Sequence, residues 1–271
     1  MSALAAAFLD LHVPGTPLLM PNPWDAGSAK VLASLGFRAL ATTSGGFAMT
    51  LGRRDGQVTR NEAIDHARAI AVAVDVPVSA DLEHGFADDP AGVADTVRLA
   101  LGAGLAGCSI EDSTGRRDDP VYDLGLARDR VAAAAEVAHG GEDRLVLTAR
   151  AENHIVGRDD LADTITRLQA YQEAGADVLF APGVVQPDAL RTLLSSVDRP
   201  VSVLALPGAP SVAGMAELGV ARISVGSAFA YVAMGALADA ARGMLEDGTF
   251  GYFEAMTAGV QAFAGASSRR A

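Results

Sequence analysis

Short apolar runs alternate with longer amphipathic segments along the whole chain. The runs have the length and aliphatic composition of buried strands. They are Pro17–Met20, Arg38–Thr42, Val76–Ala80, Gly107–Ile110, Leu145–Ala149, Asp177–Phe180, Val201–Leu204 and Arg222–Val225. Between them, apolar residues recur every three to four positions opposite a polar face, which predicts helices. The expected helices are Ala26–Leu35, Arg60–Val74, Pro90–Ala103, Leu124–His139, Asp159–Ala174, Pro187–Ser195 and Ser211–Leu218.

Eight successive strand–helix units predict an α/β fold, a (β/α)8 barrel of the TIM type, that spans residues 1–271 as a single domain. Phe229–Leu245 supplies the eighth barrel helix, and Phe250–Phe263 is expected to form an extra C-terminal helix. A doubly wound sheet would carry a glycine-rich turn after its first strand. The turn here reads Pro21-Asn22-Pro23-Trp24, which favours the barrel.

The composition narrows the class of protein and of partner. Half of the residues are hydrophobic, which excludes intrinsic disorder, and the net charge of −12 would repel nucleic acid and anionic membranes. No apolar stretch reaches the ~20 residues of a membrane span, and Met1–Leu11 lacks the basic start of a signal peptide. Cys108 is the single cysteine, so we expect a cytoplasmic protein without an internal disulfide. Lys30 is the single lysine and the one residue that Schiff-base chemistry could use.

Acidic residues gather where the third and fourth strands end, and in such barrels the catalytic residues lie at these carboxyl ends. Alternation along the third strand would place Asp81 and Glu83 on the same inward side, with Glu111 at similar height on the next strand. Converging carboxylates repel one another unless protons or a cation intervene, and oxygen ligands favour Mg²⁺ or Mn²⁺. We therefore predict a metal site of these three acids. The alternative for each acid is a helix cap or an ion pair with arginine.

Two groups near these acids are suited to bind anions. Arg150, at the end of the fifth strand, presents a planar fork to a carboxylate or phosphonate. After the second strand, the turn Thr43-Ser44-Gly45-Gly46 offers backbone N–H groups that an anion can approach closely, because glycine has no Cβ. A cation with two anion-binding groups predicts a small α-keto or α-hydroxy acid as substrate, with the metal stabilising an enolate or oxyanion.

Five segments of the chain resemble motifs of the isocitrate lyase/phosphoenolpyruvate mutase superfamily. They are Asn22–Ser28, Thr43–Gly46, Asp81–Gly85, Ile110–Asp112 and Ala149-Arg150, in the order and spacing of that family. The resemblance implies a (β/α)8 barrel, commonly a tetramer built as a dimer of dimers, whose last helix is exchanged between subunits. A homo-oligomer is therefore expected.

The resemblance also implies roles for individual residues. Ser44, Gly45 and Gly46 match the turn that holds the substrate carboxylate, and Arg150 matches the substrate-binding arginine. Asp55 matches a loop aspartate near the substrate, and Glu111 matches a glutamate of the metal shell. Asp81 and Glu83 stand where the family has Asp-x-Asp, so the second acid is one methylene longer.

The loop after the fourth strand departs from the lyases. Their loop carries a Lys-Lys-Cys-Gly-His or Lys-Arg-Cys-Gly-His motif whose cysteine acts as acid or base. The corresponding Asp112–Asp123 has no cysteine, lysine or histidine, and Ser109 replaces a strand-four histidine. We therefore do not expect isocitrate or methylisocitrate cleavage. The longer gating loop of the phosphonate mutases is absent too, so the chain is most similar to short-loop, phosphonomutase-like bacterial members.

The leading hypothesis is a Mg²⁺-dependent lyase or mutase-type enzyme. It would make or break a C–C or P–C bond in a small α-keto, α-hydroxy or phosphono acid. The candidate catalytic residues are Asp55, as a general base or polar gate residue, together with Glu111 and Arg150. Oxaloacetate-type decarboxylation or C–C hydrolysis is an alternative at the same site. A barrel that binds a keto acid without turnover is the alternative of a different class.

Several single residues have a structural interpretation beside a functional one. We expect Cys108 to be a small buried hydrophobe, and Gly226-Ser227 to be either a phosphate site or a plain helix start. His84 and His154 are placed at the mouth, as acid/base or capping groups, and three further histidines are expected at the surface: His12, His66 and His139.

The segments Phe47–Thr59 and Ser113–Asp123 are expected to overhang the mouth as mobile loops. Their arginines would either close over a bound dianion or pair with nearby aspartates. The arginines are Arg53, Arg54, Arg116 and Arg117, and the aspartates are Asp55, Asp118 and Asp119.

Overall fold

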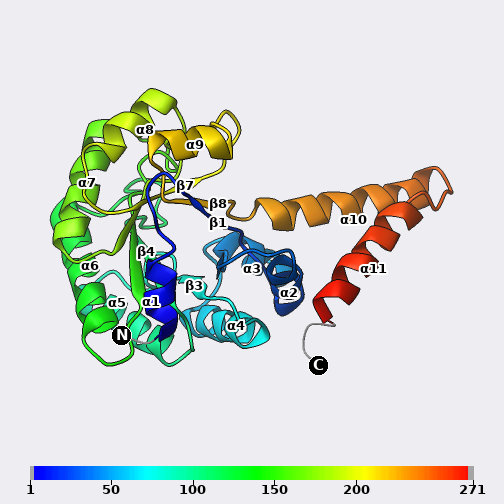
Figure 1. Ribbon diagram of the computed structural model, residues 1–271, viewed down its shortest axis with the longest axis horizontal. Helices are drawn as coiled ribbons and strands as arrows, with labels where there is room; N and C mark the ends of the chain where they lie inside the picture. Colours follow the sequence, from blue (N-terminus) through cyan, green and yellow to red (C-terminus); the bar gives the residue numbers. More distant parts are fainter. Residues whose placement is uncertain (1–2, 268–271) are drawn as a thin grey trace.

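Eight parallel strands form a nearly closed barrel in the computed structural model, which describes residues 3–267 (Figure 1). The hydrogen-bonded order around the wall is β1-β8-β7-β6-β5-β4-β3-β2. Between β1 and β2, Ala41 N–H donates to the carbonyl of Pro21 at 3.2 Å. Asn22 Nδ2 adds a bond to the carbonyl of Thr42 at 3.0 Å. The strands are β1 (Leu18–Met20), β2 (Leu40–Ala41), β3 (Val78–Asp81), β4 (Gly107–Glu111), β5 (Val146–Arg150), β6 (Val178–Phe180), β7 (Val201–Leu204) and β8 (Arg222–Ser224).

Helices alternate with the strands and most of them cover the outside of the barrel (Figure 1), which confirms the predicted (β/α)8 fold with an extra C-terminal helix. The segment expected to be the eighth barrel helix instead projects from the barrel as α10. Two short helices, α1 and α3, were not predicted. The C-terminal helix begins at Phe253 rather than at Phe250. The helices are α1 (Ala3–Leu9), α2 (Ala26–Ser34), α3 (Ser44–Thr50), α4 (Arg60–Ala73), α5 (Pro90–Leu101), α6 (Leu124–His139), α7 (Leu161–Glu173), α8 (Pro187–Leu194), α9 (Val212–Leu218), α10 (Ala228–Glu246) and α11 (Phe253–Ser267).

Side chains at the helix starts satisfy the free backbone N–H groups. At α4, Thr59 Oγ1 accepts from the N–H of Glu62 at 3.4 Å, and Glu62 Oε2 accepts from the N–H of Thr59 at 2.9 Å. At α7 the cap is Asp160, one residue after the predicted Asp159, and its Oδ1 accepts from the N–H of Asp163 at 3.0 Å. The starts of these two helices therefore follow from local chemistry to within one residue.

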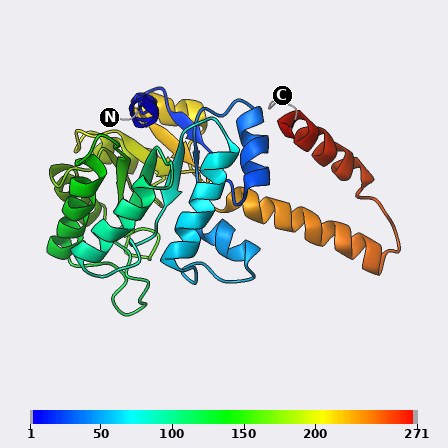
Figure 2. The same ribbon diagram turned by 90° about the horizontal axis from the view of Figure 1, so that it is seen from below.

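An apolar cluster closes the end of the barrel at which the strands begin. Phe8 of α1 is fully buried there beside Leu18, Val146 and Val178. A Cβ on Gly107 would lie 2.9 Å from the Phe8 ring and 2.7 Å from the carbonyl of Val146, so this position requires glycine. Figure 2 shows α1 at the opposite end of the barrel from the loop after β4. Helix α1 therefore fills the end away from the predicted site.

Helices α10 and α11 form an arm that projects from the barrel (Figures 1 and 2). α10 runs outward, and α11 turns back and contacts α2. Large apolar side chains of this arm face solvent, among them Val232 (69% exposed), Leu237 (61%) and Leu245 (86%). Among residues 3–267, no helix combines the length and apolar character that crossing a membrane requires.

Candidate active site

A cavity of about 190 Å³ lies at the carboxyl ends of the strands, where the sequence placed the site. Five of the predicted site residues line it: Thr43, Ser44, Asp55, Asp81 and Arg150. Four others do not: Gly45, Gly46, Glu83 and Glu111. Further polar lining comes from Ser227, considered above as part of a phosphate site, and from residues to which no role was assigned: Asn22, Glu152, Arg222 and Ser224.

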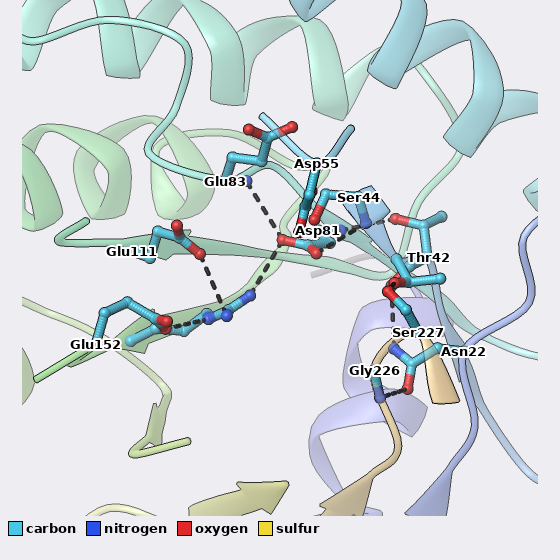
Figure 3. Close-up of polar contacts among 12 residues, drawn as sticks. Asn22, Thr42, Ser44, Asp55, Asp81, Glu83, Glu111, Glu152, Gly226 and Ser227 are labelled. Atoms are coloured by element: carbon cyan, nitrogen blue, oxygen red, sulfur yellow. Dashed lines mark hydrogen bonds and ion pairs between the residues drawn. The ribbon is translucent and has the colours of Figure 1, made fainter. Parts of the chain in front are cut away.

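The guanidinium of Arg150 contacts three carboxylates at once. Its Nη1 lies 3.2 Å from Asp81 Oδ1, its Nη2 lies 3.2 Å from Glu111 Oε2, and its Nε donates to Glu152 Oε1 at 2.8 Å (Figure 3). Arg150 also lies over the ring of Phe180, with 5.0 Å between the guanidinium carbon and the ring centroid. One cation therefore faces three acids, and two negative charges remain to be balanced by protons or by another cation.

The protonation of these acids reflects this imbalance. Burial raises the pKa of Glu111 well above its usual value, and Arg150 opposes the shift. Burial likewise raises the pKa of Glu152, again against the effect of Arg150. Protons on these two acids are one way to neutralise the cluster, and a bound cation would displace them.

Asp81 is held at the end of β3 by several hydrogen bonds. Its backbone N–H donates to Thr42 Oγ1 at 2.8 Å, and its Oδ2 accepts from the N–H of Ser44 at 3.1 Å (Figure 3). Its Oδ1 accepts from the N–H of Glu83 at 3.3 Å and from Arg150. The Asp81 carboxylate is therefore oriented before any ligand arrives.

Ser44, Gly45 and Gly46 form the first turn of α3 rather than an open turn. The N–H of Ser44 is engaged by Asp81, and the N–H of Gly46 donates to its N-cap, Thr43 Oγ1, at 3.4 Å. A Cβ on Gly45 would lie 2.7 Å from Ser227 Oγ, which shows that this glycine makes room for a side chain. Two of the three N–H groups expected to bind an anion are thus already engaged within the protein.

Glu83 lies beyond the end of β3 and, unlike Asp81, does not line the cavity. The strand ends at Asp81, and Glu83 lies in a turn with φ +48°, so strand alternation no longer applies. Figure 3 shows its carboxylate pointing away from that of Asp81. Burial, with Asp81 and Asp55 adding to it, raises the pKa of Glu83 to about 8. Glu83 therefore does not line the cavity, but it lines a small neighbouring pocket together with Asp81.

Asp55 reaches the cavity from the loop after α3, although it lies far from the strand ends in sequence. A Cβ on Gly45 would come within 3.1 Å of Asp55 Oδ2, which places this carboxylate beside the first turn of α3. Burial raises the pKa of Asp55, and a hydrogen bond from the Ser44 side chain opposes the shift. Asp55 is thus a carboxyl group that faces the cavity and holds its proton more tightly than an exposed aspartate.

The arginines of the two flanking loops do not line the cavity. Arg53 pairs with Glu62 at 2.9 Å, and Arg116 lies 3.3 Å from Asp119 and 3.7 Å from Asp88. Arg53 and Arg116 therefore form ion pairs with nearby carboxylates, which was the alternative to closing over a bound dianion. Of their partners, Asp119 was expected, whereas Glu62 and Asp88 were not.

Glu152 and Asn22 were not assigned a role from the sequence. Glu152 lies two residues after Arg150, so the alternation that linked Asp81 to Glu83 would also have drawn attention to it. Asn22 Oδ1 accepts from the N–H of Gly226 at 3.0 Å (Figure 3) and from the N–H of Val225 at 3.0 Å. Such a bond between the first and last strands depends on barrel closure, which no local pattern reveals.

Gly226-Ser227 begins α10, and contacts within the protein occupy it. The N–H of Gly226 donates to Asn22, and Ser227 Oγ is hydrogen bonded to Thr43 Oγ1 at 2.8 Å. The hydroxyl of Ser227 does not cap the helix. This segment therefore serves mainly to join β8 to the turn after β2.

The three histidines expected at the surface are buried or half-buried, so that prediction was wrong. Burial and Arg222 lower the pKa of His12 to about 3, and its Nδ1 is 2.9 Å from the carbonyl of Phe8. His66 stacks on Phe47, and His139 Nε2 is 2.9 Å from Asp177 Oδ2. These partners are distant in sequence or hidden by the fold, which is why the local pattern missed them.

For His84, His154 and Cys108, the structure favours a structural role over a catalytic one. His84 and His154 do not line the cavity, and His154 Nδ1 lies 3.4 Å from Asp159 Oδ1. Cys108 is fully buried in β4, as predicted, and burial raises the pKa of its thiol to about 12. A thiol in these surroundings is not a nucleophile.

Comparison with known proteins gives a consistent result. A family model described as phosphoenolpyruvate phosphomutase matches residues 8–245. An uncharacterised protein of Mycobacterium tuberculosis is 36% identical over 238 residues, which cover 87% of this chain and 88% of the relative. The oxaloacetate decarboxylase of Pseudomonas entomophila is 28% identical over 250 residues, which cover 88% and 84%. The solved structure of a candidate lyase/mutase from Burkholderia cenocepacia is 48% identical, covers 93% of this chain and 91% of its own, and superposes with a TM-score of 0.90.

Proposed function

Because this chain belongs to the phosphoenolpyruvate phosphomutase family, as its motifs predicted, we propose that it is a Mg²⁺-dependent enzyme acting on a small acid. Its reaction makes or breaks a C–C or P–C bond in an α-keto, α-hydroxy or phosphono acid. The observation that carries this proposal is the cluster of three carboxylates around Arg150 at the cavity. An anionic substrate could enter so acidic a site only together with positive charge.

The residues present fit a divalent cation. Within residues 3–267, no group of three or more Asp, Glu, His or Cys side chains is placed so that it could hold a metal ion by itself. Mg²⁺ does not need such a group, because it usually binds one or two carboxylates and keeps several waters. Asp81 would hold the ion directly, with Glu83 and Glu111 contacting its waters, and all three offer the oxygen donors that Mg²⁺ prefers. When bound, the ion supplies positive charge that stabilises a developing oxyanion.

The protein's own groups would then orient the substrate and move protons. Arg150 can exchange one of its carboxylate partners for the carboxylate or phosphonate of the substrate. Asp55, whose pKa is raised by burial, is placed to accept or return a proton at a cavity-facing oxygen. The apolar lining from Ile155, Phe180 and Leu204 limits water around the reacting atoms.

Isocitrate or methylisocitrate cleavage is not part of this proposal. The loop after β4 has no cysteine, and Cys108 lies buried in the strand itself. That loop is a short folded segment in which the N–H of Thr114 donates to the carbonyl of Pro120 at 3.0 Å. The loop therefore lacks the cysteine that serves those lyases as acid or base.

Oxaloacetate decarboxylation is the second candidate reaction. It is favoured by the relative from Pseudomonas entomophila, which is named for that activity and aligns with 88% of this chain. The reaction needs a cation and an enolate-stabilising site but no further nucleophile. The residues assigned above would serve it without change.

A panel of acids tests the proposal. Oxaloacetate, phosphonopyruvate, 2,3-dimethylmalate and 2-methylisocitrate are each incubated with the protein and Mg²⁺, and products are followed by ¹H and ³¹P NMR. We expect Mg²⁺-dependent turnover of at least one of the first three, abolished by EDTA. Binding without turnover on every acid would instead support a non-catalytic keto-acid-binding barrel.

We also infer that the protein works as a homo-oligomer, assembled as a dimer of dimers. The exposed apolar residues of α10 and α11 support this, because an isolated chain would leave them in water. An arm of this kind can pack on the barrel of a second copy.

A further inference from the structure

A second arginine lines the cavity, and no carboxylate within residues 3–267 contacts it. Arg222, the first residue of β8, is 3% exposed. Its Nε donates to Ser202 Oγ at 2.8 Å, and its Nη1 donates to Thr148 Oγ1 at 3.1 Å and lies 3.3 Å from His12 Nε2. Across the part of the chain that the structure describes, its Nη2 has no hydrogen-bond partner. The guanidinium therefore keeps a free donor edge.

Arg222 and Arg150 differ in how their charges are balanced. All three donor nitrogens of Arg150 face carboxylates, whereas every partner of Arg222 is neutral. Both guanidinium carbons lie near the ring of Phe180, at 5.0 Å and 5.9 Å from its centroid. They are therefore less than about 11 Å from each other, a separation that one small molecule can bridge.

A buried cation without an anion is energetically unfavourable. Burial, with Arg150 adding to it, lowers the pKa of Arg222 to about 9, so it still carries its charge at neutral pH. His12 cannot compensate, because it is neutral there. An anion that enters the cavity would supply the missing counter-charge.

We propose that Arg222 binds a second, distal anionic group of the substrate, so that the site selects small acids with two anionic groups over acids with one. The proximal group lies with Arg150 and the cation, and the distal group meets the free edge of Arg222. This inference rests on the proposed function, since it specifies which acids that function uses. It assigns Arg222 as a specificity-determining residue in the wall of the barrel.

The test measures binding rather than turnover, with succinate and its monoamide, succinamate, as inert probes in the presence of Mg²⁺. The two have similar shapes and differ by one charge. Dissociation constants come from calorimetry on the full chain. We expect the wild type to prefer succinate, and Arg222→Met to lose about 10- to 100-fold in succinate affinity with little change for succinamate. Arg222→Lys, which keeps the charge, should retain part of the preference and serves if the methionine variant does not fold.

Ser202→Ala is the matched control. Ser202 bonds to the Nε of Arg222 but does not line the cavity, so its loss weakens the structural contact and leaves the charge in place. We expect this variant to keep the succinate preference. A wild type without that preference, or an Arg222→Met protein that loses both probes equally, would overturn the assignment. The absence of turnover in the acid panel would overturn the proposed function instead, so the two failures are distinguishable.

Discussion

Arg150 sets the charge balance of the cavity. It is buried, and each of its donor nitrogens meets a different carboxylate, from the end of β3, the end of β4 and the segment after β5. Burial alone would keep Glu111 and Glu152 protonated, and the guanidinium opposes that shift. Without Arg150 these acids would have to take up protons or lose burial.

Arg150→Met should therefore destabilise the protein in a pH-dependent way. The folded-state pKa values of Glu111 and Glu152 are raised already and would rise further, so stability falls as pH increases through them. We expect a loss of about 3 kcal/mol in the free energy of unfolding at pH 8, and a smaller loss at pH 5. Urea unfolding at both pH values measures it. Arg98→Met, which breaks an exposed pair, is the control, and an equal loss at both pH values would contradict the account.

Gly45 tests the packing between α3 and the start of α10. A Cβ there would lie 2.7 Å from Ser227 Oγ and 3.1 Å from Asp55 Oδ2. Gly45→Ala should lower the free energy of unfolding by about 1–3 kcal/mol and reduce activity by displacing Asp55. Gly259→Ala in α11 meets nothing within 4 Å and should stabilise by roughly 0.5–1 kcal/mol. Thermal unfolding measures the change in stability of both variants. A Gly45→Ala protein as stable as the wild type would refute the packing argument.

The position of a side chain at the cavity was predicted correctly where the residue is the last one of a strand. It was not predicted where the backbone has already left the strand. Asp81 and Arg150 are the last residues of β3 and β5, so strand geometry placed them correctly. Glu83 follows the strand end in a left-handed conformation that no alternation rule anticipates. Arg222 was hidden at the start of an apolar run, where a single charge reads as a strand boundary rather than as cavity lining.

At the scale of elements, the pattern of apolar residues predicted the strands and the long helices. Both are defined by periodic burial, which the sequence displays directly. The missed helices, α1 and α3, have seven residues each, too few for a clear period. α3 also has two glycines directly after its first residue, and they favour a turn when considered by propensity alone.

Helix α1 gives a prediction at this scale. Phe8 is fully buried against the strand starts, at the opposite end of the barrel from the cavity. Phe8→Ala should cost about 3–5 kcal/mol in unfolding free energy but leave turnover per folded molecule near the wild-type value. Leu4→Ala, which alters an exposed residue of the same helix, should have little effect. If Phe8→Ala reduced kcat without loss of stability, α1 would be coupled to the site rather than a plug.

The whole molecule has two parts that differ in where their apolar side chains lie. The barrel has a buried apolar core, whereas the arm has exposed apolar side chains. Figure 1 shows the arm extending beyond the helices that surround the barrel. Almost none of its residues are buried in the single chain: Ala230 is the buried residue of α10, and none is found among the described residues of α11. Assembly would remove this apolar surface from water.

Charge placed on the arm should therefore break the assembly. Leu237→Glu with Leu245→Glu should convert an oligomer into a 27.7 kDa monomer in light scattering after size exclusion. Leu99→Glu on α5 alters an exposed leucine outside the arm and should leave the oligomer intact. A wild-type protein that is monomeric at micromolar concentration would contradict the inferred assembly.

The most direct test of the central claim is a calorimetric titration of Mg²⁺ into the wild type and Asp81→Ala. Asp81 is the oriented acid of the cavity, and its removal relieves repulsion, so the fold should survive. Asp65→Ala, which removes an exposed acid of α4, is the matched control. The account predicts that Mg²⁺ binding and turnover are lost in Asp81→Ala and retained in Asp65→Ala. Unchanged Mg²⁺ affinity in a folded Asp81→Ala protein would contradict it.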